Sequence, residues 1–173
     1  KETNFRKSTP IGNKKLKDQQ VVKYLLSEDL GLIQMGFAML TGIKQEREHF
    51  GLTLGLYMWH HDTVIRRNAR KVTLAILDNE QKEAFKAVWK NSYRRLYNKY
   101  AIKAALIDIE KYYIQNNLNF EDNLRIAIKS KLTSASRRSE NIKPVAINHV
   151  SSNQAKYSKL FNNLSEKDKL WIN

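Results

Sequence analysis

Arginine and lysine side chains are concentrated in two short stretches whose spacing favours binding to an anion. One stretch places four cations within two turns of a helix, and the other places a cation at every fourth residue. The candidate anion-binding residues are Arg66, Arg67, Arg70, Lys71, Lys86, Lys90, Arg94 and Arg95. Like charges this close repel one another, so a bound anion would offset that repulsion. The alternative is that these cations are solvated faces of amphipathic helices.

Histidines occur beside acids at two places, but neither has the residue set of a metal site. Glu46 and His49 have the i, i+3 spacing that di-iron helical bundles use. Such a site needs a second pair of this kind, and Glu110 is followed at that spacing by Tyr113. The run from His60 to Asp62 falls where a connection between helices belongs. We therefore predict no metal ligands and no cofactor, and we expect His149 to be solvated.

No catalytic residue can be assigned from the sequence. The chain has no Cys, which excludes disulfides, thiolate metal sites and cysteine nucleophiles. It contains no glycine-rich phosphate loop, no Gly-x-Ser-x-Gly elbow and no dinucleotide fingerprint. Nothing distinguishes the acids Asp108, Glu110, Glu121 and Asp122 from solvated ion-pair partners on helices. Enzymatic activity stays open, and a non-catalytic protein is favoured.

The first basic stretch belongs to a predicted helix hairpin. Residues 51–59 carry no charge and are apolar nearly all round, which predicts a helix covered on more than one side. Asp62 stands where an N-cap belongs, because its carboxylate can accept from the first free N–H groups of a helix. The helix that follows has one apolar stripe, formed by Ile65, Ala69, Val72 and Ile76. Its cations lie off that stripe.

The same layout occurs 33 residues earlier: Tyr24 to Asp29 aligns with Tyr57 to Asp62, and Gly36 falls where Ala69 does. The run from Ile65 to Ala69 reads Ile-Arg-Arg-Asn-Ala and follows a capping acid, which resembles the second helix of HEAT repeats. The resemblance covers about residues 20 to 77. It implies an all-α fold, an α-α superhelix of about 6–8 helices. It also implies that the second helices line a concave groove.

Four segments are predicted along the chain. Residues 1–15 form a basic arm, 16–132 the helical-repeat domain, 133–158 a flexible or extended segment rich in Ser, Asn and Lys, and 159–173 a short C-terminal helix. Within the domain, a helix over about 80–97 carries an aromatic stripe that we assign to the core, formed by Phe85, Trp89, Tyr93 and Tyr97. Asn119 with Asp122, and Ser165 with Asp168, are predicted helix caps.

Composition favours a soluble protein with an anionic partner. The 173 residues are 42% hydrophobic and carry a formal net charge of +14. No apolar run approaches the roughly 20 residues of a membrane span, and the first 15 residues have no hydrophobic signal core. We expect a cytoplasmic protein, and leave open its oligomeric state and whether it is part of a longer chain. A compositional bias of the source genome toward Lys and Asn is the alternative explanation of the charge.

Three functions fit these patterns. The favoured one is a non-catalytic interaction scaffold of α-solenoid type that binds a protein through a basic helical surface. The alternative is a sequence-tolerant nucleic-acid binder. Less favoured is an enzyme resembling the HEAT-like DNA glycosylases, which would need a tryptophan beside the base and an acid. Trp59 and Trp89 could supply the first, but neither pairs with an acid in the sequence.

Overall fold

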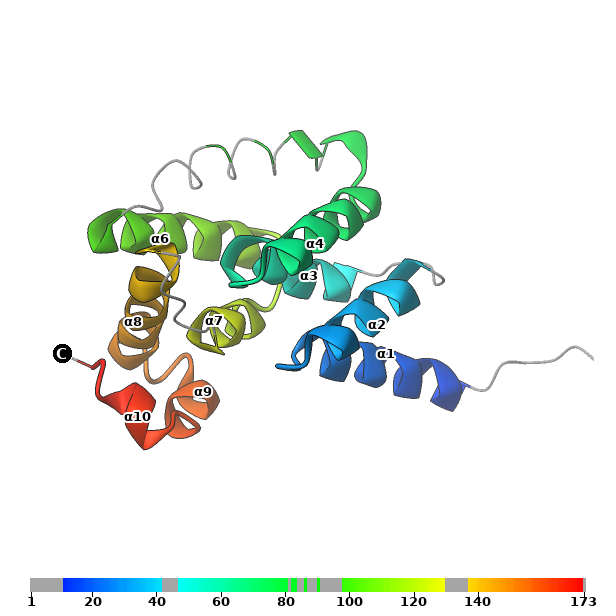
Figure 1. Cartoon of the computed structure of the whole chain (residues 1–173). Coiled ribbons are helices and arrows are strands. Elements are labelled where there is room, and N and C mark those ends of the chain that lie inside the picture. Colours follow the sequence, from blue (N-terminus) through cyan, green and yellow to red (C-terminus); the bar gives the residue numbers. More distant parts are fainter. Residues whose placement is uncertain are drawn as a thin grey trace, which may run out of the picture.

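The computed structural model describes residues 11–41, 47–80, 82–83, 86, 90, 98–129 and 137–172 (Figure 1). Over these residues the chain is helical and contains no strand, so the predicted all-α class is confirmed. Its helices are α1 (Ile11–Leu25), α2 (Leu30–Thr41), α3 (Arg47–Trp59), α4 (Thr63–Ile76), α6 (Lys99–Gln115), α7 (Phe120–Lys129), α8 (Arg137–Ser152), α9 (Ser158–Asn162) and α10 (Glu166–Lys169). None of the helices so described is long and apolar enough to cross a membrane.

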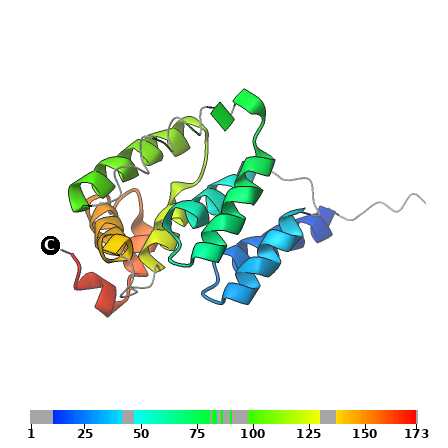
Figure 2. The same cartoon turned by 45° about the horizontal axis from the view of Figure 1, so that its top comes forward.

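The first four helices form two packed pairs, α1 with α2 and α3 with α4, and the pairs contact each other through α2 and α4 (Figure 2). Both second helices start with the same cap. Asp29 and Asp62 each accept, at 3.0 Å, the backbone N–H three residues later. The side chain two residues earlier, Ser27 Oγ in one connection and His60 Nδ1 in the other, accepts the N–H of the capping aspartate at 3.0 Å. The predicted Asp62 cap is therefore confirmed.

Small residues allow close approach between helices. A Cβ atom at Gly36 of α2 would lie 2.9 Å from Cδ2 of Leu25 on α1. Ala69, the aligned residue of α4, is completely buried. On α3, a Cβ atom at Gly55 would lie 3.4 Å from Cα of Asn123 on α7. The backbones of these helix pairs could not approach so closely with larger residues at these positions.

Helix α3 is the centre of the core, as its uncharged sequence predicts. It packs against α4 and α7 and also contacts α1. The helix side chains from Leu52 to Trp59 are nearly all buried. A chain of buried hydrogen bonds ties α3 to α6 and α7: Trp59 Nε1 donates to Asn123 Oδ1, Asn123 Nδ2 donates to the Tyr113 hydroxyl at 2.8 Å, and that hydroxyl donates to the Gly51 carbonyl at 2.9 Å. These polar groups are thus buried without loss of hydrogen bonds.

The prediction of an extended or flexible segment over 133–158 is wrong for most of its length. Residues 137–152 form α8, which packs against α6 and α7. Its buried side chains recur with helical spacing at Ile142, Val145, Ala146 and Val150. Pro144 lies inside this helix and is buried, although proline removes one backbone donor. Burial of the apolar stripe outweighs that loss and the polar composition.

Two other predicted boundaries change. Helix α1 begins at Ile11, so the last part of the predicted arm 1–15 is helical, and residues 1–10 lie outside the described residues. Pro10 immediately precedes α1, and proline is favoured at helix starts. The predicted C-terminal helix over 159–173 is instead two short helices, α9 and α10. Ser165 caps α10 by accepting the N–H of Asp168 at 3.1 Å, as predicted. Asn119 likewise accepts the N–H of Glu121 at the start of α7, at 3.0 Å.

Candidate functional site

One side of α4 carries exposed cations, and the other side is buried. Ile65 and Ala69 of the predicted stripe are buried, while the Ile76 side chain lies outside the described residues. Arg67, Arg70 and Lys71 are exposed. We call these three residues the basic face of α4. No carboxylate among the described residues forms an ion pair with any of them, so their charges are free to meet a partner.

Arg66, which was predicted to belong to this set, makes hydrogen bonds within the α3–α4 connection. Its Nη1 donates to the carbonyls of His60 and His61 at 2.7 and 2.9 Å, and its Nη2 donates to Thr63 Oγ1 at 3.2 Å. These carbonyls follow the C-terminal end of α3, where a cation is favourable. Arg66 therefore holds the α3–α4 connection together.

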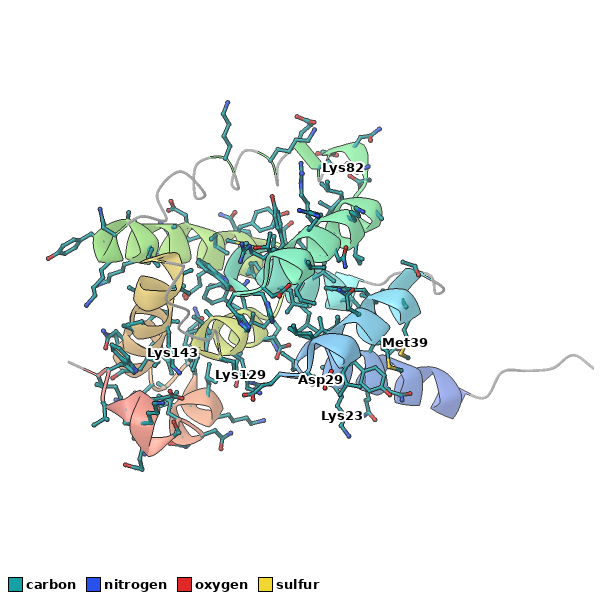
Figure 3. All side chains as sticks on the ribbon, viewed as in Figure 1. Lys23, Asp29, Met39, Lys82, Lys129 and Lys143 are labelled. Carbon is teal, nitrogen blue, oxygen red and sulfur yellow. The ribbon has the colours of Figure 1, made fainter. Side chains whose placement is uncertain are left out.

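The second predicted basic set is only partly described. Lys86 is exposed and pairs with Glu83 at 2.8 Å, and Lys90 is exposed. Lys82, which lies beyond the end of α4 in Figure 3, donates its backbone N–H to the Asp78 carbonyl at 2.9 Å. Arg94 and Arg95 lie outside the described residues, as do the aromatic side chains predicted for the core, Phe85, Trp89, Tyr93 and Tyr97.

The histidines of the α3–α4 connection serve the fold. The rings of His60 and His61 stack with their centroids 4.4 Å apart. Burial, followed by the charge of His61, lowers the pKa of His60 to about 4. His60 is thus neutral at pH 7, and its Nδ1 must be unprotonated to accept the N–H of Asp62.

His49 of the Glu46/His49 pair is buried in α3. Its Nε2 lies 4.0 Å from Asp18 Oδ1 of α1, and neither ring nitrogen makes a hydrogen bond to a described residue. Glu46 lies outside the described residues. In the part of the chain that the structure describes, no three His, Asp or Glu side chains are placed to hold a metal ion.

A cleft of about 520 Å³ lies between α6 and α8, and the sequence did not indicate it. One wall comes from α6, with Lys99, Tyr100, Lys103 and Ile107. The other comes from α8, with Val145, Asn148 and Ser152, and from Asn153 just after it. In Figure 1, α8 runs below α6. Its second wall is a helix in the region where the sequence predicts a flexible segment.

The Glu110 and His149 side chains also line this cleft and contact each other. Nε2 of His149 is hydrogen-bonded to one carboxylate oxygen of Glu110, and Lys156 Nζ donates to the other at 2.8 Å. Burial alone would raise the pKa of Glu110, but the hydrogen bonds from Lys156 and His149 outweigh burial and lower it. His149 is therefore held in an ion-pair cluster, which corrects the expectation that it is solvated.

Burial raises the pKa of Tyr157, and the charge of Glu110 adds to the effect. The Tyr157 hydroxyl stands close to this carboxylate, but outside hydrogen-bond geometry with the described residues.

The cleft contains the residue types of a serine-hydrolase triad without its connections. Ser152, His149 and Glu110 all line the cleft. A triad requires the serine hydroxyl to be hydrogen-bonded to the histidine. Among the described residues no such bond joins Ser152 to His149, and the His149 Nε2 is hydrogen-bonded to Glu110 instead. The arrangement is that of a partly polar cleft lined by a hydrogen-bonded histidine–carboxylate pair.

The structure also bears on the less favoured glycosylase-like function. Trp59 is 1% exposed and donates its indole N–H to Asn123. It therefore cannot stack on an extruded base, which is how such enzymes hold their substrate. Trp89 lies outside the described residues.

Comparisons with protein-family models, with curated proteins and with solved structures give no match. The HEAT resemblance over residues 20 to 77 therefore stays a prediction. The matching caps of α2 and α4 agree with it, but such caps also occur in helix pairs that do not belong to repeats.

Proposed function

We propose that this protein is a non-catalytic interaction scaffold, of HEAT-like α-solenoid type, that binds an acidic protein segment through α4. The observation that carries the proposal is the basic face of α4: Arg67, Arg70 and Lys71 are exposed without a carboxylate partner among the described residues. Free cations confined to two turns of one helix repel each other, and an acidic partner relieves that repulsion.

Exposed apolar side chains on α4 and on the neighbouring helix α2 favour a protein partner over a bare polyanion. Val64 is 53% exposed and precedes Arg67 by one helical turn, which puts both on the same stripe of α4. Met35 on α2 is 51% exposed. A hydrogen bond joins α2 and α4 next to these residues: Asn68 Nδ2 donates to Gln34 Oε1 at 2.8 Å. Arginine and methionine are both enriched in protein–protein interfaces.

The proposal is tested by fluorescence anisotropy with the whole chain. The probes are a labelled acidic amphipathic helical peptide, with Glu on one face and Leu on the other, and labelled single-stranded DNA, double-stranded DNA and RNA. Each titration is repeated across a range of salt concentrations. We expect the peptide to bind more tightly than the nucleic acids near physiological salt, where the screening length is about 8 Å.

A charge-reversal variant and a matched control assign the binding to α4. The variant R67E/R70E/K71E reverses the basic face. The control K23E/K159E/K167E changes the net charge by the same amount at exposed lysines of α1, α9 and α10. Figure 3 shows Lys23 on the edge of α1 away from α4. We expect the variant to lose at least about tenfold in peptide affinity, about 1.4 kcal/mol, and the control to lose much less. Equal losses would refute a specific role for α4.

Sequence-tolerant binding of nucleic acid is the second candidate, favoured by the formal net charge of +14. If this candidate is right, DNA or RNA binds more tightly than the peptide, and affinity falls steeply with the logarithm of salt concentration. If R67E/R70E/K71E loses this nucleic-acid binding, the partner of the basic face of α4 is a phosphate backbone and not an acidic peptide.

A further inference from the structure

We propose that the cleft between α6 and α8 binds a nucleoside phosphate, either as a free nucleotide or as the phosphorylated end of a strand. This site lies on a different pair of helices from the basic face of α4, and it does not depend on the function proposed for that face. The proposal combines the size of the cleft, its charge, an exposed ring at its rim and the free polar groups on its α8 wall.

The size of the cleft suits a ligand of this kind. Its volume is about 520 Å³, and pockets for small molecules and cofactors are commonly about 300–1,000 Å³. Ile107 and Val145 face it from opposite walls and supply apolar surface. Clefts between packed helices are a frequent place for such sites. The cleft can therefore enclose a ring and a sugar phosphate together.

The charge of the cleft calls for an anion. Lys99 and Lys103 stand one turn apart on the same side of α6, are exposed, and pair with no described carboxylate. The acid among the lining residues, Glu110, is already bound by His149 and Lys156. Lys99 is also the first residue of α6, where the helix dipole adds positive potential. An anionic group beside the two lysines would balance these charges.

The rim of the cleft offers a ring for stacking. Tyr100 is 88% exposed, the most exposed of the large apolar and aromatic side chains among the described residues. Leaving such a ring in water is unfavourable unless a partner covers it. It lies between Lys99 and Lys103 in sequence, and all three line the cleft. A planar base can stack on this ring while its phosphate meets the lysines.

Polar groups on the α8 wall are free to contact the ligand. Asn148 and Ser152 line the cleft and make no side-chain hydrogen bond to another described residue. By contrast, the Asn153 amide already donates to the His149 carbonyl at 2.8 Å. A free carboxamide presents both a donor and an acceptor, which matches the edge of a nucleobase. Asn148 is thus placed to select among bases.

The test is isothermal titration calorimetry of the whole chain with AMP, GMP, CMP and UMP, each up to about 5 mM, a range that detects weak binding. Adenosine and inorganic phosphate, titrated separately, show what the ring and the anion contribute. A 5′-phosphorylated tetranucleotide represents the strand end. We expect at least one nucleotide to bind more tightly than adenosine and phosphate do.

Variants connect this binding to the cleft. We expect K99E/K103E to weaken nucleotide binding at least about tenfold, because it reverses the charge that meets the phosphate. Its control, K111E/K159E, makes the same charge change at exposed lysines outside the cleft. Y100A should weaken nucleotide binding and leave phosphate binding unchanged, and N148A should change the ranking of the four bases. Far-ultraviolet circular dichroism verifies that each variant is folded.

Three results decide the proposal. Nucleotide binding that K99E/K103E loses and R67E/R70E/K71E keeps establishes the cleft as a nucleotide site, whatever the fate of the α4 proposal. If only the tetranucleotide binds, with the same loss in K99E/K103E, the ligand is a strand end. The proposal is overturned if neither ligand binds, or if K99E/K103E and its control K111E/K159E bind equally well.

Discussion

Replacement of His60 by Ser should flatten the dependence of stability on pH. His60 is 9% exposed, and burial lowers its pKa from 6.5 to about 4. The unfolded chain therefore takes up a proton on this residue at a higher pH than the folded chain does. The stability that neutral His60 contributes is complete above pH 6.5 and is lost as pH falls from 6.5 toward 4. Across this window the loss is about 3 kcal/mol.

Serine is the natural choice for this substitution because the aligned residue of the α1–α2 connection is Ser27. Its hydroxyl accepts the N–H of the capping aspartate just as His60 Nδ1 does. H60S therefore keeps the cap but cannot titrate. At pH 7 it should be less stable than the wild type by about 2 kcal/mol, since the buried ring is lost. The two proteins should approach equal stability near pH 5.

The assay is urea unfolding followed by circular dichroism at intervals between pH 4.5 and 7.5. The difference between wild type and H60S removes the contributions of Glu110, Asp122 and other groups, which titrate in both proteins. H61S is the control: it removes the charge of His61, the second cause of the His60 shift, but leaves the burial of His60 by the rest of the fold, so most of the pH dependence should remain. Parallel stability curves for wild type and H60S would refute the assignment of His60 as a buried neutral base.

Four further substitutions test the contact between α3 and α7 and the two aspartate helix caps. Gly55→Ala should destabilise the protein by about 1–2 kcal/mol despite alanine's better helix propensity, because its Cβ would lie 3.0 Å from Ile126 Cδ1 and 3.4 Å from Asn123 Cα. Urea unfolding measures this loss of stability. A stabilised variant would show that α3 and α7 are less close. Asn123→Leu should lower the stability by about 3 kcal/mol, since it leaves the buried indole N–H of Trp59 unpaired. The melting temperature should therefore fall by several °C. A melting temperature within about 1 °C of the wild type would contradict this. Asp29→Ala and Asp62→Ala should each lower the stability by about 1 kcal/mol, because each removes an N-cap. The two caps have the same geometry, so the two losses measured by chemical denaturation should be similar. A large difference would show that the two connections are not equivalent.

Elements with a local cause could be predicted from the sequence. The α3–α4 hairpin follows from an uncharged run, a capping acid and a stripe of apolar residues, all within residues 51–76. Helix α8 was missed because Ser, Asn and Lys dominate its composition and Pro144 suggested a break. Its stability comes from burial of Ile142, Ala146 and Val150 in the core, where α8 packs against α6 and α7. Only the spacing of those three residues could have indicated it.

The candidate site residues also differ in whether a local sequence pattern could predict them. Arg67, Arg70 and Lys71 could be predicted to be exposed because they lie off the apolar stripe. The role of Arg66 could not, since its partners are backbone carbonyls, which no residue pattern marks. The cleft could not be predicted either. Glu110 and His149 are 39 residues apart, and only the packing of α8 on α6 brings them together.

The buried chain of hydrogen bonds through Trp59, Asn123, Tyr113 and Gly51 has a mechanical consequence. Each bond joins a different pair of groups on α3, α6 and α7, and its strength depends on direction as well as distance. Rotation or sliding of α3 against either neighbour would break at least one bond in a dry interior, where water cannot replace it. These bonds therefore restrain α3 against swinging on α6 and α7. Because α4 packs on α3, the basic face of α4 and the α6 wall of the cleft are thus both tied to this one central helix.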